Sequence, residues 1–300
     1  MAQIDRITEA LQRANESRQS DGTDSGSQLV LHSSVVPASS RPPIPQVAPG
    51  GLRTAITYSK TRIARVPLRE LAHRRVVVDG ASRELTNSIK LIRTQIVHRM
   101  RAQGWKTLAI VSAGDDEGKT FMAVNFAVSI AMEFDQTVLL VDADLRHPSV
   151  HSYFGLPGTP GLSNYLLQHT PLDHILVNPG IDRLVILPGG TPQPNSAELL
   201  GSPPMAALVA DLKSRYADRL VLFDLPPILR VADTLSLAPL VDAFVLVVED
   251  AKTRRDDIQQ VKQILGTANV IGVVLNKSRE HVVSSADAEP GWLDRLFGRR

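Results

Sequence analysis

A loop of the kind that binds phosphate is the first chemical feature of this sequence. Gly118-Lys119-Thr120 lies between two apolar runs, residues 108–112 and residues 121–132. In such a loop the backbone N–H groups surround phosphate oxygens, the lysine bridges them and the threonine hydroxyl ligates Mg²⁺. The first glycine of the usual spacing would fall on Ala113, and Gly114 comes one place late. Taken alone, the motif therefore also fits a surface turn.

Three aspartates stand where apolar strands are expected to end. Asp142 and Asp144 follow residues 137–141, and Asp224 follows residues 220–223. Because ligands bind at the carboxyl ends of the strands in a parallel sheet, these side chains should converge on the loop. Mg²⁺ usually takes one or two carboxylates together with phosphate oxygens. The loop and the aspartates together predict a site for a nucleoside triphosphate and magnesium.

The elements that would position these residues are short apolar strands that alternate with helices. The expected strands span residues 108–112, 137–141, 184–187, 220–223, 243–248 and 270–275. The expected helices span residues 83–99, 119–134, 196–216 (interrupted by Pro203-Pro204) and 255–265. Apolar strands without polar alternation are typical of a parallel sheet covered on both faces. The predicted fold class is α/β, with a mostly parallel sheet and helices on both faces.

Composition narrows the classes of function. The chain has 300 residues, 43% of them hydrophobic, and a formal net charge of +2, which suits one sizeable domain and does not favour nucleic acid as a partner. It contains no cysteine, which excludes disulfides, thiolate metal sites, iron–sulfur clusters and cysteine nucleophiles. No apolar run reaches the length of a membrane span, and the polar N-terminus does not resemble a signal peptide. We expect a cytoplasmic protein.

Four segments are predicted along the chain. They are a short amphipathic docking helix at residues 1–16, a disordered Ser/Gly/Pro linker at 17–52, the P-loop domain at 53–278 and a tail at 279–300. The first segment fits a fraying terminus equally well. Basic residues concentrate in residues 53–75, which fits a solvated face and also a contact with acidic lipid or a partner protein.

The order of the motifs resembles the bacterial tyrosine kinases (BY-kinases) of exopolysaccharide and capsule export. The matching segments are Gly118-Lys119-Thr120, residues 139–148 (LLVDADLRHP), residues 194–200 (PNSAELL), residues 221–227 (VLFDLPP) and residues 272–277 (GVVLNK). The branch that the chain resembles most is the tyrosine autokinases associated with exosortase-type loci, which lack a membrane domain.

The resemblance carries expectations about fold, ligands and partners. It implies a P-loop NTPase fold of the SIMIBI, MinD-like type that binds ATP and Mg²⁺. It implies phosphoryl transfer to tyrosine, self-association, and a membrane polysaccharide co-polymerase or chain-length regulator as partner. Through that partner, through residues 53–75 or through the tail, the chain would be peripheral to the inner membrane.

The resemblance also gives each motif residue a role. Lys119 and Thr120 would contact phosphate and magnesium, Asp142 and Asp144 would assist the attacking hydroxyl and organise magnesium, and Asp224 would be the Walker B acid. The predicted catalytic residues are Lys119, Asp142 and Asp144, and the predicted metal ligands are Thr120, Asp144 and Asp224. The predicted nucleotide contacts are Gly114, Glu117, Gly118, Lys119, Thr120, Phe121 and Asn276, the last of these near the adenine.

Two departures from the family pattern concern the acceptor and the oligomer. The family's C-terminal tyrosine cluster is missing, because the tyrosines are Tyr58, Tyr153, Tyr165 and Tyr216. Tail autophosphorylation is therefore excluded, and Tyr58 is the candidate acceptor. The family's oligomerisation motif, E-x-x-R-x-x-R, has here Asn87, Lys90 and Arg93. Losing the acid and one arginine removes a bidentate ion pair, which puts a ring-shaped oligomer in doubt.

The third departure lies in the loop itself, where Asp115-Asp116 replaces the family's usual Pro-Gly. A carboxylate about 6 Å from a phosphate charge costs roughly 3 kcal/mol at an effective dielectric near 20, unless the side chain faces solvent and is screened. We predict that restoring Pro-Gly tightens ATP binding. Unchanged affinity would mean that both carboxylates face solvent.

Two other functions remain open at this stage. A catalytically weak, nucleotide-dependent switch or scaffold that regulates a polysaccharide co-polymerase would keep the same site and would need no tail tyrosines. A positioning ATPase of the ParA/MinD type would carry a second lysine near the start of the loop, where this chain has Gly114.

Overall fold

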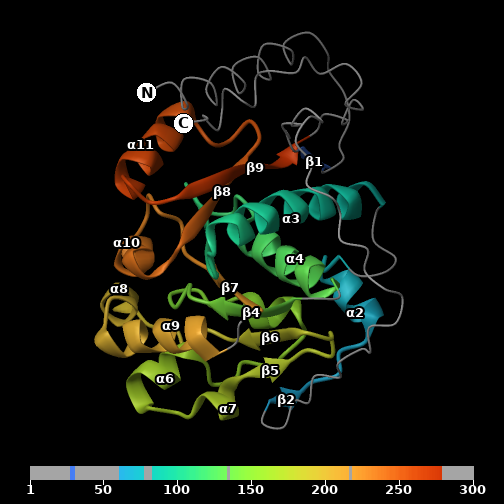
Figure 1. The fold of residues 1–300 in the computed structure, drawn as a ribbon, viewed down its shortest axis with the longest axis vertical. Helices are drawn as coiled ribbons and strands as arrows, with labels where there is room; N and C mark the ends of the chain where they lie inside the picture. Colours follow the sequence, from blue (N-terminus) through green and yellow to red (C-terminus); the bar gives the residue numbers. More distant parts are fainter. Residues whose placement is uncertain (1–27, 31–60, 78–82, 134–135, 216–217, 279–300) are drawn as a thin grey trace.

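A single sheet organises the part of the chain that the computed structural model describes, residues 28–30, 61–77, 83–133, 136–215 and 218–278. Within those residues the sheet has nine strands in the order β1-β9-β8-β3-β7-β4-β6-β5-β2 (Figure 1). The strands are β1 (Gln28–Val30), β2 (Arg62–Ile63), β3 (Thr107–Ser112), β4 (Thr137–Asp142), β5 (Val177–Asn178), β6 (Leu184–Leu187), β7 (Arg219–Asp224), β8 (Ala243–Glu249) and β9 (Val270–Ser278). The six strands from β9 to β6 pair in parallel, whereas β1 and β5 pair antiparallel to β9 and β6.

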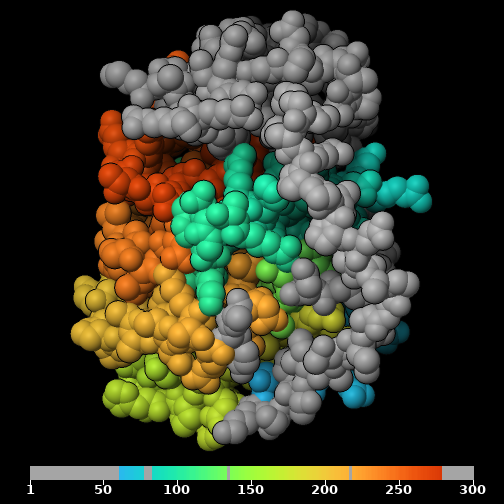
Figure 2. Space-filling model, viewed as in Figure 1, coloured from blue at the N-terminus to red at the C-terminus, as the bar shows by residue number. Residues whose placement is uncertain are grey.

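Helices cover both faces of this sheet, as a buried parallel sheet requires. They are α2 (Leu68–His73), α3 (Arg83–Gln103), α4 (Lys119–Ala131), α5 (Val150–Tyr153), α6 (Leu162–Gln168), α7 (Leu172–Ile175), α8 (Ser196–Leu200), α9 (Pro203–Arg215), α10 (Asp233–Leu237) and α11 (Arg255–Leu265), with a 3₁₀ turn η2 (Ala238–Leu240). In the space-filling view, residues around α3 lie across the middle of the face shown (Figure 2).

Alternation along the central strand β3 divides the core into two layers. Leu108 and Ile110 pack with buried residues of α3 and α4, whereas Ala109 and Val111 pack with those of α9 and α11. Successive side chains of a strand point to opposite faces, so one apolar strand supplies both layers. The predicted α/β fold, with a mostly parallel sheet between two helical layers, is confirmed.

Every strand and helix expected from the sequence in the described region is present, with small shifts at the ends. The expected helix at residues 196–216 is divided into α8 and α9, and Pro203 and Pro204 are the first residues of α9. Proline is accepted there because the first helical N–H groups have no partner within the helix. Sequence periodicity did not predict the short elements β2, β5, α2, α5, α6, α7 and α10, which have too few residues to show a period.

The predicted segment boundaries are tested only in small part. Gln28–Val30 falls inside the predicted linker, yet the structure forms strand β1 there, paired with β9. An edge strand such as β9 offers unpaired backbone groups that can bind even a short extended segment. The predicted docking helix and the predicted tail lie outside the described residues. Among the helices that are described, none combines the length and the apolarity of one that crosses a membrane.

We predict that Gly161→Ala destabilises the fold. A β-carbon on Gly161 would lie 2.0 Å from the carbonyl oxygen of Pro188 and 2.5 Å from the nitrogen of Gly190, so backbone must move to admit it. We expect the free energy of unfolding to fall by about 2 kcal/mol or more, measured by urea denaturation. Gly158→Ala is the matched control, since nothing lies within 4 Å of a β-carbon there. Equal stability of the two variants would contradict the prediction.

Candidate nucleotide-binding site

The strand order brings the predicted site residues together at one edge of the sheet. Strand β7 lies between β3 and β4, and Asp142 and Asp224 are direct register partners at the ends of β4 and β7. The loop after β3 leads into α4, which begins at Lys119. Three residues that are far apart in the sequence therefore meet because their strands end side by side.

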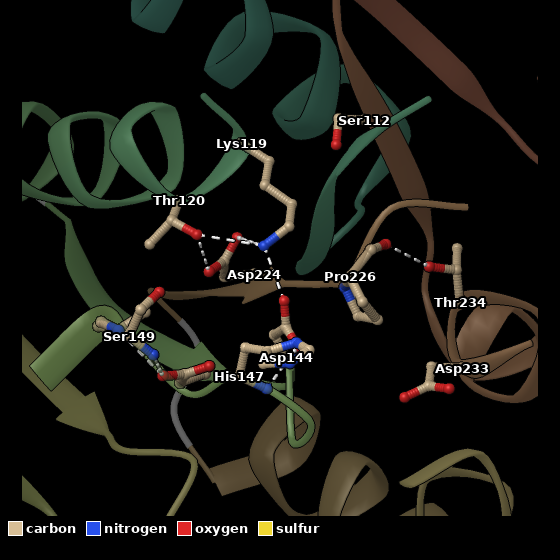
Figure 3. A network of polar contacts seen from close by, with 12 residues as sticks. Ser112, Lys119, Thr120, Asp144, His147, Ser149, Asp224, Pro226, Asp233 and Thr234 are labelled. Atoms are coloured by element: carbon tan, nitrogen blue, oxygen red, sulfur yellow. Dashed lines mark hydrogen bonds and ion pairs between the residues drawn. The ribbon is translucent and has the colours of Figure 1, made fainter. Parts of the chain in front are cut away.

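Lys119 and Thr120 point from the start of α4 toward the carboxylates (Figure 3). The Lys119 Nζ atom lies 2.8 Å from Asp144 Oδ2 and 4.0 Å from Asp224 Oδ1. The Thr120 hydroxyl donates a hydrogen bond of 2.7 Å to Asp224 Oδ2. Asp142 accepts backbone N–H bonds from Ser149 and Val150 at 2.9 and 3.0 Å. All of these side chains except Lys119 are buried.

Burial and like charge dominate the electrostatics of this cluster. Desolvation, with a further contribution from Asp224, raises the pKa of Asp142 well above its ordinary value. Desolvation also raises the pKa of Asp224 to about 6, although Lys119 and the Thr120 hydrogen bond oppose the shift. Burial alone would lower the pKa of Lys119, but attraction to Asp224 and Asp144 outweighs it and raises that pKa. Three carboxylates around one lysine thus leave an excess of negative charge that favours a cation.

The donor set fits magnesium. Asp142 Oδ1 and Asp224 Oδ1 are buried and accept no hydrogen bond within the described part of the chain, which leaves two hard oxygen atoms unsatisfied beside the Thr120 hydroxyl. Among the described residues, no three His, Cys, Asp or Glu side chains form a complete ligand set. Mg²⁺ needs no such set, because it keeps several waters and takes further ligands from phosphates.

Glu117 and Asn276 fix the shape of the loop. Gly118 has a φ of 94°, and a β-carbon there would lie 1.9 Å from Asn276 Nδ2, so only glycine fits. The Asn276 amide donates to the Glu117 carbonyl oxygen at 2.8 Å. The buried Glu117 carboxylate accepts bonds from the Ala113 N–H at 2.9 Å and from the Thr253 hydroxyl at 2.6 Å. The Glu117 side chain therefore stabilises the loop from behind, and only its backbone is available to a phosphate.

The acidic pair at the tip of the loop is exposed. The Asp115 carboxylate is 65% exposed and lies 3.2 Å from the guanidinium Nε of Arg230. The Asp115 and Asp116 carbonyl oxygens accept bonds from Lys252 at 2.8 Å and from Lys277 at 2.7 Å. Both lysines also pair with Glu249, at 3.1 and 3.0 Å. The geometry favours the alternative in which solvent screens the two carboxylates.

A cleft of about 790 Å³ opens over this cluster. The lining comes from residues 72–85, from the loop and the start of α4, and from residues 144–153, 227 and 276–277. It includes Ala72, Arg75, Val76, Val77, Leu85, Asp115, Asp116, Gly118, Lys119, Thr120, Phe121, Asp144, His147, Ser149, Tyr153, Pro227, Asn276 and Lys277. Of the predicted nucleotide contacts, Gly118, Lys119, Thr120, Phe121 and Asn276 line the cleft, whereas Gly114 and Glu117 line a neighbouring cavity. The cleft has the volume expected of a small-molecule site.

Comparison with known proteins agrees with this geometry. Residues 108–288 match the family described as the CobQ/CobB/MinD/ParA nucleotide binding domain. The chain is 36% identical over 189 residues to "Tyrosine-protein kinase YwqD" of Bacillus subtilis (strain 168), which covers 62% of this chain and 78% of that protein. It is 30% identical over 203 residues to "Putative tyrosine-protein kinase CapB" of Staphylococcus aureus, covering 67% of this chain and 88% of the relative. The chain belongs to the bacterial tyrosine kinases.

The kinase fold is also seen in solved structures. The kinase domain of Escherichia coli tyrosine kinase ETK matches with a TM-score of 0.63 at 29% identity, over 69% of this chain and 81% of that chain. The chimerical protein CapA2B2 matches with a TM-score of 0.63 at 26% identity, over 73% of this chain and 94% of that chain. The P-loop NTPase assignment is thereby confirmed, and the chain is a nucleotide-binding protein of this kinase family.

The helix α3 carries Arg93, the arginine at one position of the oligomerisation motif that the resemblance implies. Arg93 binds within its own chain, donating to the Ser129 carbonyl oxygen at 3.0 Å and pairing with Glu133 at 2.8 Å. Asn87 and Lys90 are exposed. Arg93 is thus bonded to the end of α4 and to Glu133, which follows that helix, within its own chain.

Several site residues were not predicted from the sequence. Thr253, which holds Glu117, follows β8 and could have been found by the same strand-end argument that identified the aspartates. Tyr153 and Ser149 follow the second motif closely, but no residue pattern marks them as cleft residues. Arg75 lies before α3, and only tertiary packing brings it to the cleft.

We predict that Asp224→Asn changes how stability depends on pH. A pKa raised from 3.8 to about 6 means that the folded protein binds a proton which the unfolded chain releases, so this group destabilises the fold increasingly as pH rises from about 4 to 6. We compare the free energies of unfolding of the variant and the unmodified protein in EDTA and without nucleotide. From pH 4.5 to pH 7.5, the difference should shift by about 2 kcal/mol in favour of the variant. Urea denaturation at both pH values measures this. A constant difference between the two proteins would refute the prediction.

We predict that the acidic pair has little effect on nucleotide affinity. Removing both charges without changing shape, with Asp115→Asn and Asp116→Asn, should alter the Kd for Mg-ATP by less than about threefold, because exposed charges are screened. Isothermal titration calorimetry measures the Kd, and Lys119→Met serves as the control that loses a cation of the site. Tightening by about a hundredfold would show instead that the carboxylates face the phosphates.

Proposed function

We propose that this chain transfers the γ-phosphoryl group of Mg-ATP to a tyrosine hydroxyl, as a kinase of exopolysaccharide or capsule production. The observation that carries this proposal is the buried cluster in which Lys119 lies 2.8 Å from Asp144 and Thr120 donates to Asp224 at 2.7 Å. Phosphoryl transfer needs such an arrangement of cations, carboxylates and a metal more than it needs a covalent catalyst. The kinase names of the relatives support the same reaction.

The residues divide the work of the reaction between them. Lys119 and the backbone N–H groups of the loop would hold the phosphates, and Thr120, Asp144 and Asp224 would hold Mg²⁺. The chemistry supplied by a bound Mg²⁺ is neutralisation of charge on the phosphates. Asp142, whose pKa is raised mainly by burial, suits the acceptor of the tyrosine proton. The new bond joins the phenolic oxygen to the γ-phosphorus, the bond from that phosphorus to the β-phosphate oxygen breaks, and ADP leaves.

The acceptor tyrosine is proposed to be Tyr58 of the same protein or a tyrosine of a partner. Tyr58 lies outside the described residues, in the basic segment that precedes α2. The branch of kinases associated with exosortase-type loci, which the motifs resemble, stays a prediction. Loss of phosphotyrosine in the Tyr58→Phe variant would support Tyr58 as the acceptor. Unchanged phosphotyrosine would point to another tyrosine.

A membrane partner is proposed from the exposed basic surface formed by β2, the start of α2 and the residues between them. Within residues 61–77, Arg62, Arg65 and Arg69 are exposed, and Ile63 and Leu68 are 52% and 57% exposed beside them. Cations interleaved with apolar side chains suit a membrane polysaccharide co-polymerase or the acidic lipid around it.

We predict that the protein retains Mg-ATP and forms phosphotyrosine, and that Lys119→Met abolishes both. Lys119 is a cation of the site with no nearby substitute on α4, so its loss should weaken ATP binding at least about tenfold. Filter binding with labelled ATP measures retention, and phosphotyrosine is detected by immunoblot and mass spectrometry. ATP retention without phosphotyrosine would support the switch or scaffold instead of the kinase. Equal retention by the two proteins would refute nucleotide binding at this site.

A further inference from the structure

The segment after α2 forms one wall of the cleft and is fastened to the helix that carries Lys119. The side chain of Asn125, fully buried on α4, donates to the Arg75 carbonyl oxygen at 3.1 Å and accepts from the Val77 N–H at 2.6 Å. Arg75, Val76 and Val77 line the same cleft as Lys119. The position of Arg75 relative to the phosphate-binding loop is therefore set by a buried polar contact, although Arg75 precedes Lys119 by 44 residues in the sequence.

Arg75 has a left-handed backbone conformation, which glycine adopts more readily than arginine. Its φ is +62°, and it directly follows Arg74, the C-cap residue of α2. The Arg75 N–H is bonded to the Ala72 carbonyl oxygen at 3.0 Å and the Val76 N–H to that of Leu71 at 2.9 Å. This hydrogen-bond pattern closes many helices and usually has glycine at the left-handed position, because a β-carbon there costs about 1 kcal/mol. An arginine in a strained conformation at the rim of a cleft points to a use for its side chain.

The guanidinium of Arg75 is available to a ligand. Within the described part of the chain its side chain makes no hydrogen bond or ion pair. Its neighbour Arg74, by contrast, is bonded to Glu70 at 3.1 Å and to the Ser152 carbonyl oxygen at 2.7 Å. The charge of Arg75 also acts inside the cleft. Burial and Asp224 raise the pKa of Tyr153, and Arg75 partly opposes that rise.

The two lysines that line the cleft already have partners. Lys277 is bonded to the Asp116 carbonyl oxygen at 2.7 Å and paired with Glu249 at 3.0 Å. Lys119 already has Asp144 at 2.8 Å and Asp224 at 4.0 Å, with buried Asp142 behind them, so the lysine alone does not balance the charge of a triphosphate. Arg75 and Tyr153 line the same cleft, and Arg74 donates to the Ser152 carbonyl oxygen directly before Tyr153, whereas Asn276 lies against Gly118. Under the proposed function, in which Asp142 accepts the tyrosine proton, the attacking hydroxyl and the terminal phosphate would lie on the side of the Asp142 and Asp144 motif.

We propose that Arg75 binds the terminal phosphate of the nucleotide and is the second protein cation of phosphoryl transfer in this cleft. This rests on the proposed function, because it requires ATP to occupy the site. A planar guanidinium presents two parallel N–H donors to a phosphate, and such charge-assisted bonds are among the stronger contacts that a side chain makes. The residues before α3 would then complete the active site as well as connect it to the preceding chain.

Arg75→Gly is the sharpest test, because it removes the cation while relieving the backbone. The variant should unfold at the same temperature as the unmodified protein or higher, so a loss of binding would not reflect a damaged fold. With Mg²⁺ present, we expect its Kd for ATP to rise about tenfold or more, while its Kd for ADP changes by less than about threefold. Isothermal titration calorimetry gives both values. Arg75→Lys, which keeps the charge and loses the paired donors, should fall between the two proteins.

Lys262→Ala is the control. Lys262 is an exposed cation on α11 and does not line the cleft, so its removal should leave both Kd values unchanged. Equal weakening of ATP and ADP by Arg75→Gly, no weakening, or an equal effect of Lys262→Ala would each overturn the role of Arg75 and leave the proposed function standing. If the unmodified protein and Lys119→Met retain ATP equally poorly, both the proposed function and the role of Arg75 fail.

Discussion

The structure of the site depends on one electrostatic constraint, the placing of three carboxylates around a single lysine below the surface of the cleft. Asp142 and Asp224 stand opposite each other in register at the ends of two neighbouring strands, where their charges repel. Burial raises the pKa of both aspartates, and repulsion from a neighbouring carboxylate, which Lys119 opposes, adds to the rise. A cluster of this kind is stabilised by a divalent cation and by the phosphates that accompany it. The repulsion among the carboxylates destabilises the fold without ligand, and a bound Mg²⁺ would relieve that repulsion.

The remainder of the fold holds this cluster in a defined geometry. The loop before α4 is supported by the buried carboxylate of Glu117, which is bonded to Thr253 and to the Ala113 N–H, and by Lys252 and Lys277 at its outer carbonyl groups. These contacts come from the ends of β8 and β9, so five neighbouring parallel strands, β9, β8, β3, β7 and β4, contribute to one site. A loop supported from behind keeps its N–H groups free to face phosphate.

Residues 68–77, which precede α3, are bonded to the helices around the nucleotide site. Residues 68–77 pack between α4 and α5, with Arg74 bonded to the Ser152 carbonyl oxygen and Asn125 bonded to Arg75. The motifs that define the kinase family begin only after this segment. The proposed role of Arg75 links the nucleotide site to this segment, so that the catalytic unit would begin at α2 and not at α3.

The sequence by itself determined the fold class and most of the site. Apolar runs without alternation predicted the parallel strands, and aspartates directly after them predicted the cluster, because strand ends in a parallel sheet must meet at one edge. Two features could not be predicted. The direction of the Asp115 carboxylate was decided by its pairing with Arg230, and the place of Arg75 was decided by the buried side chain of Asn125. In both cases the partner is distant in the sequence, and only tertiary packing brings the two side chains within reach.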